Sequence, residues 1–116
     1  MKLSFKAMDV INIYRSPNPE YLRRLPDFIK ILVKNITRRS TLICGDFNVD
    51  VRRNPNNLLV QTLKKEGFTQ IVREPTNIHG STIDHVYIRG KNCASYFLHY
   101  PYYTDHEAVC VTLKKK

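Results

Sequence analysis

Three short stretches of the sequence place ionisable side chains at the ends of apolar runs. They are Ile43-Cys44-Gly45-Asp46-Phe47-Asn48, Ser81-Thr82-Ile83-Asp84-His85-Val86 and Thr104-Asp105-His106-Glu107-Ala108-Val109. Strand ends can hold such side chains rigidly, as a chemical site requires. Together the stretches supply a histidine that can act as acid or base, a carboxylate to orient it, and further carboxylates for a divalent cation.

Each stretch taken alone also has an ordinary structural explanation. A lone carboxylate at a strand end, such as Asp46, is usually a cap or a turn former. His85 and His99 are expected to be ordinary strand or surface residues rather than ligands. Asp84 stands within an apolar strand, where an acid is costly to bury unless it is paired. The joint occurrence of the three stretches favours a shared site.

The elements that must position these residues alternate between strands and helices. Strands are predicted over residues 3–14, 41–44, 68–72, 82–89, 96–100 and 108–113, which are rich in apolar and β-branched types. The order β-α-β-α-β-β-β-β predicts a mixed α/β fold, and the length of 116 residues allows one domain, residues 1–116. Helices on one face of a sheet leave its other face without a cover in this chain.

Two amphipathic helices are predicted. The first begins near Glu20, and Pro26 favours a first turn nearer Leu25. Its apolar stripe is Leu22, Leu25, Ile29, Leu32 and Ile36. The second begins at Asn54-Pro55, with Asn54 as the cap, and stops at Gly67.

The charge and the cysteine content indicate which binding partners and which cellular compartment to expect. Nineteen Lys and Arg against ten Asp and Glu give a net charge of +9, which favours a polyanionic partner, nucleic acid first, although a merely basic surface explains it equally well. Cys44, Cys93 and Cys110 are odd in number and far apart, as free thiols of a reducing compartment would be. With no signal-like or membrane-spanning stretch, an intracellular protein, nuclear or cytoplasmic, without a membrane role is expected.

Four motifs in order resemble those of the endonuclease/exonuclease/phosphatase family. They are an N-x-Y-x-x-P segment at residues 12–17, then GDFN, S-x-I-D and S/T-D-H-x-x-V, from about Val10 to Val111. The residues within these motifs are most similar to those of endonucleases of non-LTR retroelements (retrotransposons) and their abasic-site relatives. The resemblance implies part of a deoxyribonuclease-like, four-layer α/β sandwich.

The resemblance also implies roles for individual residues. Tyr14 would contact the scissile phosphate, Asp46 would orient or deprotonate the attacking water, and Asn48 would stabilise the developing oxyanion. Asp84 would orient His106, and His106 would hydrogen-bond a phosphoryl oxygen. These roles meet the needs of phosphodiester hydrolysis.

The resemblance implies a metal ion as well. Asp105 would help to hold it. Magnesium or manganese suits an oxygen-rich site, whereas zinc would require Cys and His ligands at a spacing that the chain lacks.

The chain departs from the family upstream of Val10. The first half of the family's domain supplies an asparagine and the main metal-binding glutamate, and Glu20 has no matching context. We therefore expect a truncated domain whose inner sheet face is exposed, covered by a second copy, or covered by a missing half-domain.

The sequence thus predicts a metal-dependent DNA endonuclease fragment, retroelement-derived and weak or inactive alone. Arg52 and Arg53 follow the GDFN loop and are expected to touch the phosphate backbone. Two alternatives stay open: a non-catalytic, basic nucleic-acid-binding module, and a relative that hydrolyses phosphoinositides or sphingomyelin.

Overall fold

Seven strands and two helices are present in the part of the chain that the computed structural model describes, namely residues 2–4, 8–15, 18–36, 40–90, 92–99, 106 and 108–115. The strands are β1 (Lys2–Ser4), β2 (Asp9–Tyr14), β3 (Thr41–Asp46), β4 (Thr69–Gln70), β5 (Asp84–Arg89), β6 (Asn92–His99) and β7 (Ala108–Lys115). The helices are α1 (Pro19–Lys34) and α2 (Leu58–Lys65). Neither helix is long and apolar enough to cross a membrane.

A five-stranded sheet in the order β1-β2-β3-β5-β4 organises the fold. β2 and β3 are parallel, because α1 returns the chain to the starting end of the sheet, and the other neighbours are antiparallel. In this register Tyr14 lies beside Asp46, and Asp46 lies beside Asp84. Three of the predicted site residues therefore stand in a row across neighbouring strands.

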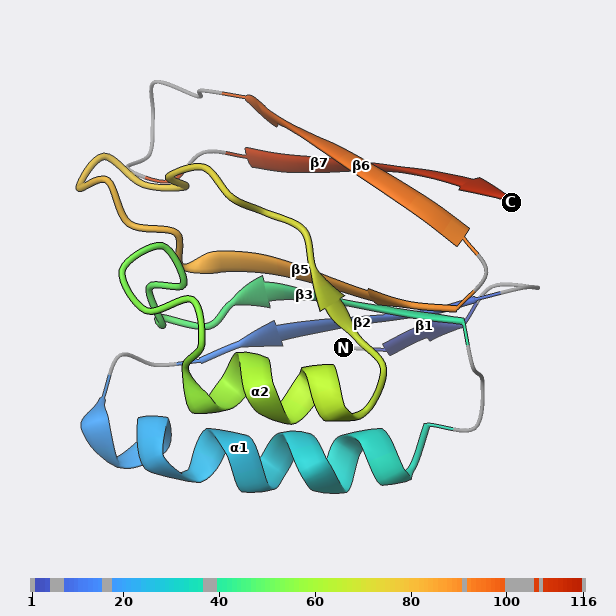
Figure 1. Ribbon diagram of the computed structural model, residues 1–116, viewed down its shortest axis with the longest axis horizontal. Coiled ribbons are helices and arrows are strands. Elements are labelled where there is room, and N and C mark those ends of the chain that lie inside the picture. The colour runs from blue at the N-terminus through green and yellow to red at the C-terminus, as the bar shows by residue number, and fades with distance from the viewer. Residues whose placement is uncertain are drawn as a thin grey trace.

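The two helices cover one face of this sheet (Figure 1). In α1, Leu25, Ile29 and Val33 recur every four residues and are buried. They form a core with residues of α2 and of the sheet: Ile11, Ile43, Phe47, Leu59, Leu63, Phe68 and Tyr87.

A two-stranded sheet of β6 and β7 lies over the other face (Figure 1). Tyr96, Val109 and Val111 pack there against a second core of Met8, Leu42, Val72 and Val86. The expectation that the chain has nothing to cover this face is therefore wrong for its centre. Coverage is partial, because Asn12 of β2 stays exposed beside an open pocket that Val109 and Val111 also line.

Gly45 allows β2 and β3 to approach closely just before Asp46. Its φ angle is +148°, and a Cβ atom at this position would lie 1.7 Å from the carbonyl oxygen of Ile13. Any side chain would push the two strands apart, so the backbone requires glycine here.

Two predictions for the amino-terminal region are wrong. Residues 3–14 form two antiparallel strands rather than one, with Leu3 opposite Val10. α1 begins at Pro19, next to the predicted start near Glu20, and the alternative first turn nearer Leu25 is wrong, because Asn18 accepts a hydrogen bond from the backbone N–H of Glu20 as the cap. Pro26 lies inside the helix on its buried side, where the apolar packing of α1 offsets the lost backbone bond.

The second helix is also capped by a different residue than predicted. Asn57, not Asn54, is the cap, and its Oδ1 accepts from the N–H of Val60 at 3.1 Å. The end at Gly67 is confirmed: Gly67 has φ +89° and donates to the carbonyl of Lys64, while Phe68 donates to that of Leu63.

Strand boundaries elsewhere differ by a few residues from the prediction. β6 begins at Asn92, four residues before the predicted start, and β4 shrinks from residues 68–72 to Thr69–Gln70. The N–H of Val72 bonds to the side chain of Gln70 at 2.6 Å instead of joining the sheet.

The cap assignment can be tested directly. Asn57→Ala should lower the free energy of unfolding by about 1 kcal/mol, because it removes a cap hydrogen bond. Asn54→Ala should change it by less than about 0.5 kcal/mol, since this side chain is exposed. Urea unfolding of both variants measures the difference, and a larger loss in Asn54→Ala would contradict the assignment.

Candidate active site

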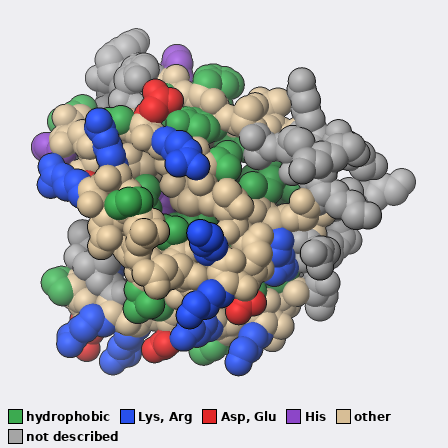
Figure 2. Space-filling model, viewed as in Figure 1, with side chains coloured by type: hydrophobic (Ala, Val, Ile, Leu, Met, Phe, Trp, Pro, Cys, Tyr) green, Lys and Arg blue, Asp and Glu red, His purple; other side chains and the backbone are tan. Residues whose placement is uncertain are grey.

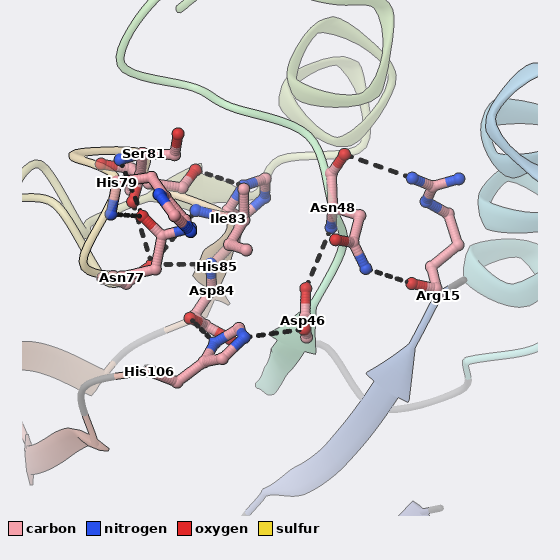
Figure 3. Close-up of polar contacts among 12 residues, drawn as sticks. Arg15, Asp46, Asn48, Asn77, His79, Ser81, Ile83, Asp84, His85 and His106 are labelled. Atoms are coloured by element: carbon pink, nitrogen blue, oxygen red, sulfur yellow. Dashed lines mark hydrogen bonds and ion pairs between the residues drawn. The ribbon is translucent and has the colours of Figure 1, made fainter. Parts of the chain in front are cut away.

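Asp46, Asp84 and His106 form the centre of the candidate site (Figure 3). Nδ1 of His106 lies 2.9 Å from Oδ2 of Asp84, and Nε2 lies 3.8 Å from Oδ2 of Asp46. A carboxylate can only accept, so Nδ1 carries the proton of the short bond and Nε2 faces Asp46. The three side chains are half-buried. The imidazole is therefore oriented by one acid and presented beside another.

Arg15 and Asn48 fix the loop that follows Asp46. The guanidinium of Arg15 is buried and donates to the carbonyls of Phe47 at 2.5 Å and Asn48 at 3.2 Å. Asn48 returns a bond from Nδ2 to the carbonyl of Arg15 at 2.5 Å (Figure 3). Its φ angle of +51° is in the left-handed region, which asparagine tolerates well. In this conformation the N–H of Asn48 donates to Oδ1 of Asp46 at 3.1 Å.

A loop over residues 74–83 holds the other two members of the centre. Thr76 is fully buried, and its Oγ1 accepts from the N–H groups of Ile83 and Asp84 at 3.1 Å each. The backbone of Asn77 forms a β-bridge with His106, while its Oδ1 accepts from Ser81 (Figure 3). The loop thus connects the start of β5 with the segment that carries the histidine.

His85 supports the site from within the core, as expected for a structural histidine. Its Nε2–H donates to the carbonyls of Val49 at 2.7 Å and Thr82 at 3.1 Å, and Nδ1 lies 2.9 Å from the hydroxyl of Tyr87. Its ring stacks on Phe47 at 5.0 Å. Burial lowers the pKa of His85, so the neutral form holds both loops together.

The surroundings of Asp46 disfavour its charged form. Burial raises the pKa of Asp46, and the nearby carboxylate of Asp84 raises it further. The N–H of Asn48, His106 and Arg15 oppose the shift but do not cancel it. A carboxylate with a raised pKa binds a proton or a cation more readily than an ordinary aspartate does.

The same three residues could hold a metal ion. One ligand atom from each of Asp46, Asp84 and His106 lies within 4.8 Å of the others. Two carboxylates and one imidazole fit magnesium or manganese better than a metal that prefers thiolates, so the donor set suits the metal implied by the sequence.

The remaining predicted residues have different outcomes. Tyr14 lies beside Asp46 in the sheet, but its side chain is 74% exposed and makes no hydrogen bond to any described residue. Asp105 lies outside the described residues. Arg52 and Arg53 are exposed, and Nε of Arg53 lies 3.4 Å from Oδ2 of Asp50. Neither arginine lines the pocket beside the centre.

Sequence reasoning missed four positioning residues: Arg15, Thr76, Asn77 and His85. Arg15 had an available signal, since it directly follows Tyr14 within the N-x-Y-x-x-P segment. Thr76 and Asn77 had only the general turn preference of their types. The contacts by which they hold the site are distant in sequence: Thr76 to Ile83 spans seven positions, and Asn77 to His106 spans twenty-nine.

Comparison with known proteins identifies the fold. No protein-family model and no curated protein sequence matches the chain. Among solved structures, CdtB, the biologically active subunit of cytolethal distending toxin, matches 96% of the chain with a TM-score of 0.64 and 15% identity. The chain has part of a deoxyribonuclease I-like fold.

A second structure agrees with this fold. The mannosyl-6-phosphatase Bt3783 of Bacteroides thetaiotaomicron VPI-5482 matches 92% of the chain with a TM-score of 0.53 and 14% identity. The chain covers 50% of each of the two structures.

The raised pKa of Asp46 predicts a cost in stability. Stability from this group is fully present below its unfolded pKa and is lost as pH rises through the higher folded pKa. Asp46→Asn removes the ionisation, so with metal chelated it should melt at a higher temperature than the wild type at pH 7. The difference should shrink as pH falls toward about 4.

Asp27→Asn is the matched control, because Asp27 is exposed on α1 and the change in net charge is the same. Magnesium should raise the melting temperature of the wild type more than that of Asp46→Asn. Equal melting temperatures for the two variants at pH 7 would contradict the predicted cost.

Proposed function

We propose that the chain is half of a metal-dependent phosphodiester hydrolase domain, derived from a retroelement DNA endonuclease and weakly active or inactive alone. The observation that carries the proposal is the Asp84–His106–Asp46 arrangement at the strand ends of a deoxyribonuclease I-like fold. The free thiols of Cys44 and Cys110 fit the proposed nuclear or cytoplasmic location.

In the proposed reaction Asp46 handles the attacking water. Its raised pKa makes it a better proton acceptor near neutral pH than an ordinary aspartate. Its Oδ1 accepts from the backbone of Asn48, which leaves Oδ2, beside His106, for the water.

His106 and Asn48 contact the phosphoryl group. The Nδ1–H bond to Asp84 fixes the ring, so Nε2, once it also carries a proton, can donate a hydrogen bond to a phosphoryl oxygen that enters beside Asp46. One N–H of the Asn48 amide is used by Arg15, and the second remains for the developing negative charge. Tyr14 adds an exposed hydroxyl next to Asp46 for the scissile phosphate.

A magnesium or manganese ion held by Asp46 and, by the family resemblance, Asp105 would neutralise charge on the phosphate and lower the pKa of a bound water. The family's main metal-binding glutamate belongs to the half that has no counterpart in this chain. We propose that this half on a separate polypeptide, or else a second copy of the chain, covers the open part of the inner sheet face near Asn12.

A binding module without catalysis is the second candidate, and the net charge of +9 favours it. The same charge fits DNA better than a neutral substrate. Phosphoinositides are also polyanionic, so a lipid headgroup phosphodiester is the third candidate.

The activity can be tested by single-turnover cleavage of supercoiled DNA. The purified chain should cleave weakly in magnesium or manganese, because a main metal ligand has no counterpart. His106→Ala and Asp46→Ala should each lower any cleavage by about 100-fold or more, since each removes a group that acts in the transition state.

A complementing half-domain that carries the family's asparagine and glutamate motifs should raise cleavage by the wild type but not by His106→Ala. His99→Ala is the control, since His99 is exposed on β6. If the chain binds DNA but the added half-domain does not raise cleavage, the non-catalytic module is favoured. Robust cleavage by the chain alone would refute the need for a second half.

The predicted backbone contacts of Arg52 and Arg53 give a separate test. Each phosphate contact contributes about 0.9 to the slope of log K against log salt, so Arg52→Ala/Arg53→Ala should flatten it by up to about 2. Lys30→Ala/Lys34→Ala, exposed on α1, removes the same charge and should leave the slope nearly unchanged. An equal slope for both double variants, measured by anisotropy of a labelled duplex, would rule out the contacts.

A further inference from the structure

A second pocket lies apart from the candidate active site. It is bounded by α2, by the turn before α2 and by the segment around β4, and it has a volume of about 440 Å³. The pocket beside Asp46 and Asp84 is smaller, about 320 Å³, and the two have no lining residue in common. The larger pocket has the size of an ordinary small-molecule site.

Three cations from three different segments line this pocket. Arg52 comes from the turn after β3, Lys64 from the last turn of α2, and Arg73 from the chain after β4. All three are exposed, and none forms an ion pair or a side-chain hydrogen bond with any described residue. Among the residues that the structure describes, no Asp or Glu lines the pocket. Two acids close in sequence to these cations have other partners: Asp50 pairs with Arg53, and Glu74 accepts from Tyr96.

The floor of the pocket is apolar. Val51 and Phe68 are almost fully buried, and Val60 is half-buried beside them. An apolar floor below unpaired cations suits a ligand with a planar or apolar part and a phosphate. Basic side chains predominate over acidic ones on the face of the molecule in Figure 2, which favours the approach of such an anion.

We propose that this pocket binds a nucleotide, with its phosphate at Lys64 and Arg73 and its base or sugar against Val60 and Phe68. The nucleotide is either free or part of a single DNA strand, since both present the same chemistry. The inference goes beyond the proposed function, because it assigns a second binding site and requires no catalysis.

The test is a titration of the isotope-labelled chain, followed by NMR, in EDTA and at constant ionic strength. The three probes are inorganic phosphate, a deoxynucleoside monophosphate and a short single-stranded oligonucleotide. Amide signals of Val60, Phe68 and Gln70 should shift with the nucleotide or the strand, while that of Asp84 should not. Shifts with the strand alone would identify DNA as the source, and shifts with both would identify a general nucleotide site.

Lys64→Ala/Arg73→Ala should weaken this binding by about tenfold or more, because it removes two charge-assisted contacts. Lys65→Ala/Arg24→Ala removes the same charge from exposed positions that do not line the pocket. All four side chains are exposed, and thermal melting checks that both double variants stay folded.

Equal weakening in the two double variants, or shifts spread evenly over the surface, would overturn the proposal. His106→Ala should bind the nucleotide as the wild type does. A chain that binds here but does not cleave DNA even with the complementing half-domain would therefore refute the endonuclease activity and leave the pocket assignment intact.

Discussion

The antiparallel pairing of β3 with β5 places two carboxylates side by side. Asp46 ends one strand, Asp84 begins the other, and the register sets them directly opposite. Two like charges so close together need a partner, and His106 provides it by reaching Asp84 through Nδ1 and facing Asp46 through Nε2. The loops around the site can be understood as supports for this arrangement.

Two buried polar groups keep the loops in place. Arg15 holds the carbonyls of Phe47 and Asn48, and His85 holds those of Val49 and Thr82. Both are charged or chargeable groups taken out of water, and burial lowers the pKa of each. The fold thus accepts a desolvation cost to keep the residues next to Asp46 and Asp84 rigid, as a preorganised site requires.

Sequence reasoning grouped the three residues that the structure brings together at the centre of the candidate site, but it missed the residues that support them. Asp46, Asp84 and His106 were predictable because each belongs to a short motif with a fixed local context. Arg15 and Thr76 act through backbone groups of residues far along the chain, and a hydrogen bond to a backbone group leaves no mark on the sequence of its acceptor. The helix ends show the same limit: the turn residue Gly67 was correct, whereas Asn54 and Asn57 are equally good caps in sequence and only the three-dimensional turn selects Asn57.

The order of strands and helices was sufficient to predict the mixed α/β fold, but it could not predict where β6 and β7 pack. Their apolar positions alternate as in any half-buried strand, so the pattern could not say which surface they would meet. The structure puts Val109 and Val111 on the sheet face that was expected to be bare.

The short motif around Asp46 has a consequence for how far a sequence match can be trusted as a sign of activity. Steric closeness to Ile13 demands Gly45, the helix-side core demands Phe47, and a left-handed backbone suits Asn48. A descendant that had lost its catalytic activity would still be selected to keep these three residues, because the fold requires them. Ionised Asp46, by contrast, is a net cost to stability because its pKa is raised, so we expect this residue to be replaced early once selection for catalysis ends.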